Sequence, residues 1–95
     1  MRTPTAPAGI EHVYHLYVIE TGQRDAVQHR LRAREIDTGI HYPVPAHLQE
    51  ACAWLGYKAG DFPATEAASA RILSLPMYAE LTEAQIDYVA EAING

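Results

Sequence analysis

The residues best suited to chemistry lie on one short loop, residues 39–47, with the sequence GIHYPVPAH. His41, Tyr42 and His47 place two imidazoles and a phenol there, and each can donate or accept a hydrogen bond. Pro43 and Pro45 restrict φ to about −65° and remove two backbone donors, so this loop is stiff and cannot be a central strand. A rigid loop carrying such side chains is a reasonable binding site. The alternative is a proline-rich turn that only connects a strand to a helix.

Other kinds of site lack support in the sequence. His12 and His15 are three residues apart on a predicted strand, so they face opposite sides and cannot chelate together. No cysteine or carboxylate spacing completes a zinc site, and we expect no metal. Ser69 and Ser74 lack a nucleophile-elbow pattern, and no glycine-rich phosphate loop is present.

Length and composition indicate one small globular domain. The chain has 95 residues and a net charge of −5, which argues against nucleic acid as a partner. Its basic residues gather mainly in one predicted helix and read as a solvated face: Arg24, Arg30, Arg32 and Arg34. Cys52 is the only cysteine, so no internal disulfide can form and a reducing compartment is expected. No apolar run is long enough for a membrane span or a signal peptide, and we expect a cytoplasmic protein.

The first half of the chain predicts a tail, two strands and a helix. Residues 1–9 are rich in proline and small residues and read as a tail or linker remnant, so the domain is expected to span residues 10–95. Residues 10–20 are the strongest strand signal, apolar on both faces from 13 to 19. A helix is expected over 23–34 and a short strand over 36–40.

The second half predicts three helices and a strand. Leu48, Ala51, Cys52 and Leu55 fall at helical spacing, so 47–55 is expected to be a helix whose stripe, Cys52 included, faces the core, with Gly56 as its stop. Pro63 opens an alanine-rich helix, and residues 72–75 form a strand that Pro76 ends.

The last helix begins at a capping box of Thr82 and Gln85, and its expected buried stripe follows at Ile86, Val89, Ala90 and Ile93. The order of these elements predicts an α+β, two-layer sandwich with a small sheet of about three strands and about four helices.

Residues 13–93 resemble the C-terminal small domain of the DegT-type (DegT/DnrJ/StrS) sugar aminotransferases, which are pyridoxal-phosphate enzymes of fold type I. No single matching segment is specific, but their order and spacing are those of the family. The segments are HLYVI (15–19), RD (24–25), TGIHYPVP (38–45), HLQ (47–49), LGY (55–57), GDFP (60–63), LSLPM (73–77) and LT (81–82) with Gln85.

The resemblance implies a division of labour. In the family, the large domain carries the pyridoxal-phosphate pocket and the lysine that forms the Schiff base, and no such domain is found in these 95 residues. The only lysine, Lys58, lies in a polar loop, so we expect no catalytic or cofactor-binding residue and no cofactor for this chain alone. Glu35 stands where the family usually has glycine, so the preceding helix is expected to be capped differently.

The resemblance also implies substrate-binding roles for His41, Tyr42 and His47, because the matching loop faces the active-site cleft near the nucleotide-sugar end. The alternative is that these side chains only pack or cap locally. His47, at the predicted start of a helix, could simply hydrogen-bond the first turn.

Three functions remain open. The first is the C-terminal domain of a nucleotide-sugar aminotransferase that transfers an amino group to a keto-sugar, with the large domain as partner in cis or in trans. The second is a free-standing interaction or docking module without catalytic activity, and the third is a small ligand-binding domain. The first strand, apolar on both faces, predicts an exposed apolar patch near residues 41–43 and self-association of the chain through it. The patch is expected to contain at least one aromatic residue among Tyr14, Tyr17, Tyr42 and Trp54.

Overall fold

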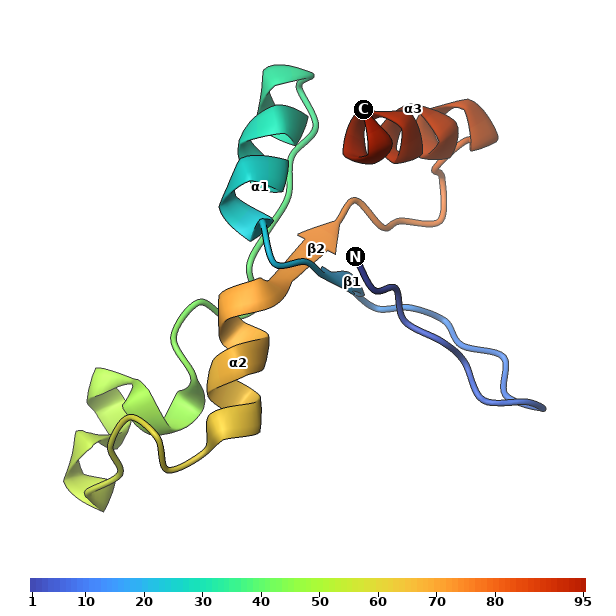
Figure 1. Ribbon diagram of the computed structural model, residues 1–95. Helices are drawn as coiled ribbons and strands as arrows, with labels where there is room; N and C mark the ends of the chain where they lie inside the picture. The colour runs from blue at the N-terminus through green and yellow to red at the C-terminus, as the bar shows by residue number, and fades with distance from the viewer.

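A computed structural model describes all residues, 1–95. In chain order the elements are β1 (Tyr17–Glu20), α1 (Arg24–Ala33), the 3₁₀ segments η1 (Ala46–Leu48) and η2 (Glu50–Leu55), α2 (Pro63–Arg71), β2 (Ile72–Leu75) and α3 (Glu83–Asn94). Figure 1 shows α1 and α3 above the two strands, with α2 and the 3₁₀ segments below them. The α+β class expected from the sequence is confirmed.

The sheet consists of two antiparallel strands, β1 and β2, with Tyr17 opposite Leu75 and Glu20 opposite Ile72. A single bridge extends each edge: Arg2 pairs with Glu20, and Gly39 pairs with Ser74. The third strand expected over 36–40 is therefore reduced to one residue, Gly39, which exchanges two backbone hydrogen bonds with β2.

The first strand is shorter than its sequence predicts, because β1 begins only at Tyr17. Tyr14 has a φ of +48° and donates its backbone N–H to Nδ1 of His12, so residues 12–14 turn instead of extending. Residues 1–16 form a projecting arm in Figure 1. The arm begins against β1, where Arg2 and Glu20 also form an ion pair of 3.0 Å, and it ends where β1 starts at Tyr17.

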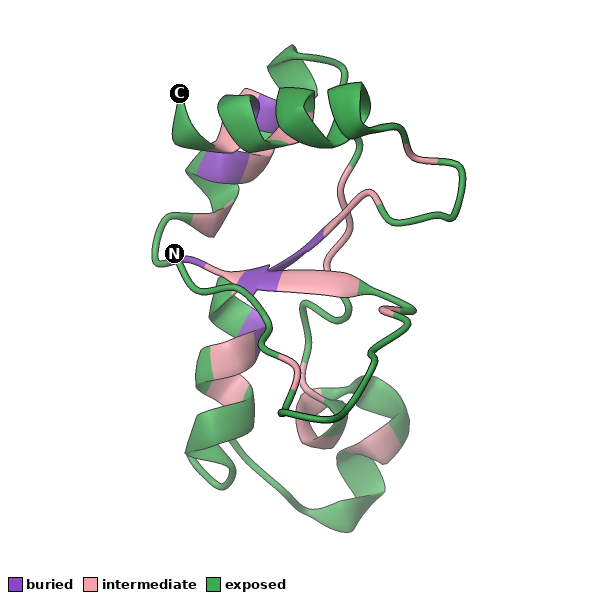
Figure 2. Ribbon diagram, turned by 90° about the vertical axis from the view of Figure 1, so that its right-hand side faces the viewer, coloured by how far each residue is buried: buried purple, intermediate pink, exposed green.

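The core lies where α1 packs against β2 and α3. Its buried hydrophobic residues are Ile19, Val27, Leu31, Ile36, Leu73 and Ala92. The Arg30 guanidinium on α1 donates to the carbonyl oxygens of Ala92 and Ile93, so it satisfies acceptors that the end of α3 leaves free. Figure 2 shows that burial is concentrated around the sheet, α1 and α3.

The end of α1 keeps the glycine-type geometry despite Glu35. Glu35 adopts a left-handed φ of +61°, its N–H binds the carbonyl of Arg32, and the Ile36 N–H binds the carbonyl of Leu31. These two bonds define a Schellman motif, with Leu31 and Ile36 as its hydrophobic contact. The expectation of a different cap is wrong: the cap is the usual one, with glutamate in a conformation that favours glycine.

The predicted helix over 47–55 is wrong. Gln49 has an extended ψ of 144°, so the segment divides into η1 and η2. Leu55 is 46 % exposed and Cys52 is only half-buried, outside the core. No residue from 37 to 68 is buried, so the apolar stripe has no surface to pack on, and packing is the main source of helix stability in proteins. The left-handed stop at Gly56 is confirmed.

The N-terminal ends of α2 and α3 agree with the sequence-based prediction. Pro63 occupies the first turn of α2, and the Thr82–Gln85 capping box is present at α3. The buried face of α3 differs from the predicted stripe, because Ala92 is buried whereas Ile86 is 52 % exposed. Val89 and Ile93 are half-buried against the core. No helix of this structure has the length and apolar character needed to cross a membrane.

Candidate functional site

His41 is held against the edge of the sheet. Its Nδ1 lies 2.8 Å from the Ser74 hydroxyl, and Ser74 is buried within β2. Gly39 makes room for the imidazole, because a Cβ at that position would lie 2.8 Å from Cε1 of His41. The single bridge between Gly39 and Ser74 therefore places the His41 ring.

Tyr42 lies beside His41 and faces solvent. The two rings meet edge to face with centroids 5.5 Å apart, and Tyr42 is an exposed residue. The phenol is accessible for a ligand contact. Apart from the His41 ring, no side chain fixes its position, and its hydroxyl forms no hydrogen bond.

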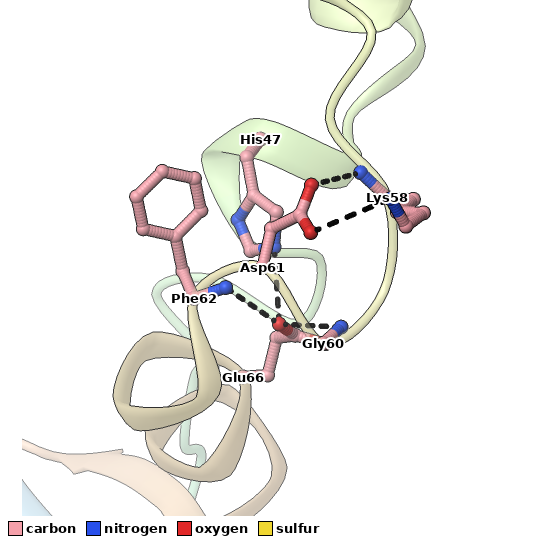
Figure 3. A network of polar contacts seen from close by, with 6 residues as sticks. All are labelled: His47, Lys58, Gly60, Asp61, Phe62 and Glu66. Carbon is pink, nitrogen blue, oxygen red and sulfur yellow. Dashed lines mark hydrogen bonds and ion pairs between the residues drawn. The ribbon is translucent and has the colours of Figure 1, made fainter.

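His47 is the most enclosed of the three predicted site residues, since His41 and Tyr42 are exposed. Its side chain is only 7 % exposed, and its Nε2 lies 3.3 Å from Oε2 of Glu66 on α2. The rings of His47 and Phe62 meet in a T-shaped arrangement with centroids 4.8 Å apart, and the centroids of Tyr57 and Phe62 are 5.0 Å apart. The segment from η1 to α2 thus folds around one imidazole (Figure 3).

Glu66 connects this segment and was not identified from the sequence. Its carboxylate accepts the backbone N–H of Gly60 at 2.8 Å and that of Phe62 at 3.1 Å, in addition to its contact with His47. The Gly60 hydrogen bond, followed by Phe62 and His47, lowers the pKa of the Glu66 carboxyl from its usual 4.5, against an opposing effect of desolvation.

A local signal for Glu66 was available in the sequence. The helix begins at Pro63 after the apolar Phe62, which cannot cap it, and Glu66 lies one turn later where a carboxylate can reach back to free N–H groups. Its contact with His47, nineteen positions away, has no such local signal.

The three predicted site residues of the loop therefore belong to two separate small groups of side chains. One contains His41, Tyr42 and Ser74, and the other contains His47, Glu66 and Phe62. No hydrogen bond or ring contact joins the two groups. No group of three histidine, cysteine, aspartate or glutamate side chains is arranged to hold a metal ion.

Lys58 lies at the rim of the second group. Its side chain is 84 % exposed, and its Nζ is 3.9 Å from Oδ1 of Asp61. The other Asp61 oxygen accepts the Lys58 backbone N–H at 2.8 Å, which tightens the turn before α2 (Figure 3).

An apolar groove of about 430 Å³ lies elsewhere, between the sheet, the N-terminal arm and α3. Eleven of its fourteen lining residues are hydrophobic, among them Tyr14, Tyr17, Leu75, Ile86 and Val89. The groove contains Tyr14 and Tyr17, two of the aromatics expected in an apolar patch, but no residue of 41–43 lines it, so the expected position beside that loop is wrong.

Comparison with known proteins identifies relatives over nearly the whole chain. The model of the DegT/DnrJ/EryC1/StrS aminotransferase family matches residues 1–94. A "pleiotropic regulatory protein" of Geobacillus stearothermophilus is 46 % identical over 96 % of the chain. A UDP-N-acetyl-3-dehydro-alpha-D-glucosamine 3-aminotransferase of Acidithiobacillus ferrooxidans is 41 % identical over 98 % of the chain.

Solved structures agree with these relatives. S. venezuelae DesV, solved in complex with a ketimine intermediate, superposes with a TM-score of 0.90 at 36 % identity over 97 % of the chain. A DegT/DnrJ/EryC1/StrS aminotransferase from Brucella abortus gives a TM-score of 0.86 at 37 % identity over 98 % of the chain.

The similarity covers nearly the whole of this chain but only part of the length of each relative. The chain spans about a quarter of the length of each relative: 24 % and 25 % of the two curated proteins and 25 % of both solved chains. Since the family model covers all but the last residue, the chain belongs to the DegT/DnrJ/EryC1/StrS aminotransferase family.

Proposed function

We propose that this chain acts as the C-terminal small domain of a nucleotide-sugar aminotransferase, which transfers an amino group to a keto-sugar. The observation that carries the proposal is similarity along the whole chain to proteins named as nucleotide-sugar aminotransferases, of which it spans a quarter. Its work in such an enzyme is to complete the substrate cleft. A cytoplasmic location agrees with the single, unpaired Cys52.

The surface of the chain supports a large partner. Its accessible area is 7014 Å² at 10.5 kDa, whereas a monomer of that mass exposes about 5,400 Å². Its radius of gyration is 15.5 Å, against about 12 Å for a compact domain of 95 residues. The excess area, about 1,600 Å², is larger than the roughly 800 Å² that each partner contributes to a standard protein interface.

The apolar groove is the face we assign to that partner. It combines exposed parts of α3 with Tyr14 and Tyr17 from the arm and β1. A contiguous apolar surface of this kind is typical of a contact with another protein. The occupant we propose is the aminotransferase large domain, in cis or in trans.

Pyridoxal phosphate, when bound in such an enzyme, carries the amino group between substrates. The residues of this chain do not fit the site that would hold it. A Schiff-base lysine must be desolvated, and Lys58 is largely exposed and held toward Asp61. Both the lysine and the cofactor pocket are therefore assigned to the large domain.

His41, Tyr42 and His47 are proposed as substrate contacts. The support for His41 and His47 is that partners on β2 and α2 hold their rings, which reduces the entropy lost when a ligand binds. Tyr42 offers an exposed phenol beside His41. None of the three is assigned a role in the chemical step.

A chimera provides the test. In the A. ferrooxidans enzyme, the segment that matches this chain is replaced by residues 1–95, and amino transfer to its UDP-linked 3-keto sugar is measured. We expect activity to be retained, and His47→Ala to raise KM more than it lowers kcat. A chimera that folds and binds cofactor but cannot bind the sugar would contradict the proposal. A free-standing docking module, the alternative, would bind a large domain without restoring transfer.

A further inference from the structure

Glu66 fixes more of its surroundings than any other polar side chain in this half of the molecule. It sits on α2, yet its carboxylate binds two backbone N–H groups of the preceding turn and the ring of His47 on η1 (Figure 3). No residue between 37 and 68 is buried, so hydrogen bonds rather than a core hold this segment. Glu66 is the common partner of the side-chain hydrogen bonds that join η1 and the turn at Gly60–Phe62 to α2.

The contact with Glu66 decides which ring nitrogen of His47 carries hydrogen. An ionised carboxylate can only accept hydrogen bonds. Oε2 of Glu66 lies 3.3 Å from Nε2, so Nε2 must be the donor. In the neutral imidazole the other nitrogen, Nδ1, then carries a lone pair and can only accept.

Nδ1 is not fully buried, although the His47 side chain as a whole is only 7 % exposed. The structure has no buried side-chain nitrogen or oxygen that lacks a hydrogen-bond partner. His47 is only half-buried as a residue and its Nδ1 takes part in no hydrogen bond, so this atom reaches the surface. Phe62 packs edge to face against the ring at 4.8 Å and limits its rotation.

We propose that Glu66 is a positioning residue that holds His47 as the Nε2–H tautomer, with Nδ1 presented as an acceptor for a hydroxyl or amide N–H of the sugar. The substrate part of this inference rests on the proposed function. This tautomer determines which part of the substrate His47 can bind. Nδ1 of the neutral ring accepts a hydrogen bond, so it needs a donor and cannot bind the phosphates of the nucleotide, which only accept.

Nitrogen-15 NMR of the 95-residue chain tests the tautomer directly. Above the pH at which the imidazole loses its charge, we expect the two-bond correlations of His47 to report Nε2–H. In Glu66→Gln, the amide oxygen can keep a backbone contact while its NH₂ faces the ring, which favours the Nδ1–H form. Glu83→Gln is the matched control, because Glu83 is exposed and forms no side-chain hydrogen bond.

The wild-type spectrum decides the question even if Glu66→Gln fails to fold. An Nδ1–H tautomer in the wild-type chain would overturn the inference. An unchanged tautomer in a folded Glu66→Gln chain would also overturn it.

The chimera tests the substrate part. We expect Glu66→Gln to raise KM about three- to tenfold, the loss of one neutral hydrogen bond, with kcat little changed. An unchanged KM would exclude the acceptor role of Nδ1. A folded chimera that is inert without any substitution would instead contradict the proposed function, while the tautomer measurement still decides the role of Glu66.

Discussion

At the scale of single residues, Glu66 makes stability depend on pH in a defined window. Its folded-state pKa is lowered from 4.5, chiefly by the Gly60 N–H, so the folded chain holds the proton less tightly than the unfolded chain. The stabilisation is therefore complete above about pH 4.5 and is lost as the pH falls through the lower, folded-state pKa.

Urea denaturation of the wild-type chain and Glu66→Gln checks this dependence. At pH 7 we expect a lower midpoint for Glu66→Gln, because the amide cannot replace all the hydrogen bonds of the carboxylate. The difference should shrink as the pH falls below the folded-state pKa. A difference that stays constant as the pH is lowered from 7 until the carboxyl of the folded chain is protonated would contradict the assigned cause.

Substitutions of two leucines distinguish the observed core from the apolar stripe that the sequence predicts over residues 48–55. Leu31 is fully buried, whereas Leu55 is largely accessible on η2. We expect Leu31→Ala to lower the free energy of unfolding by about 2–5 kcal/mol and Leu55→Ala by less than about 1 kcal/mol. Equal losses in denaturant titrations would mean that residues 50–55 contact a core that the structure does not show.

At the scale of elements, the end of α1 carries a correctable strain. Glu35 has a φ of +61° at the left-handed position of a Schellman motif, where a Cβ is unfavourable. We expect Glu35→Gly to raise the free energy of unfolding by about 0.5–1 kcal/mol, after the greater entropy of glycine in the unfolded chain is subtracted. Glu35→Ala keeps the Cβ and should show no such gain in thermal denaturation.

At the scale of the whole molecule, the apolar groove should govern association. We expect the chain to self-associate weakly when no large domain is present, since the groove combines the exposed Ile86 with the half-buried Tyr14 and Tyr17. Ile86→Glu places a charge in the groove that association would have to desolvate. It should shift the sedimentation profile toward monomer at tens of micromolar, a concentration of the order suited to weak contacts.

Val13→Glu is the matched control for the groove. Val13 is a highly exposed apolar residue that does not line it, so this variant should associate like the wild-type chain. Equal association of Ile86→Glu and wild type would assign the contact to another surface, such as the exposed Trp54.

The sequence by itself determined the features that depend on neighbours along the chain. The capping box at Thr82, Pro63 at the start of α2 and the stop at Gly56 are all present as predicted. Each is decided by hydrogen bonds and steric limits within about one helical turn, so local residue types are sufficient. The short motifs also identified the family, because their order and spacing along the chain are those of its members.

The tertiary structure alone decided what joins distant segments. The stripe from Leu48 to Leu55 has helical spacing but no core to pack on, and Gln49 divides it into two 3₁₀ segments. His47 likewise is held in place only because Glu66, nineteen positions away, reaches it from α2. Periodicity shows which face of an element is apolar, but burial and side-chain pairing depend on what the rest of the chain brings opposite that face.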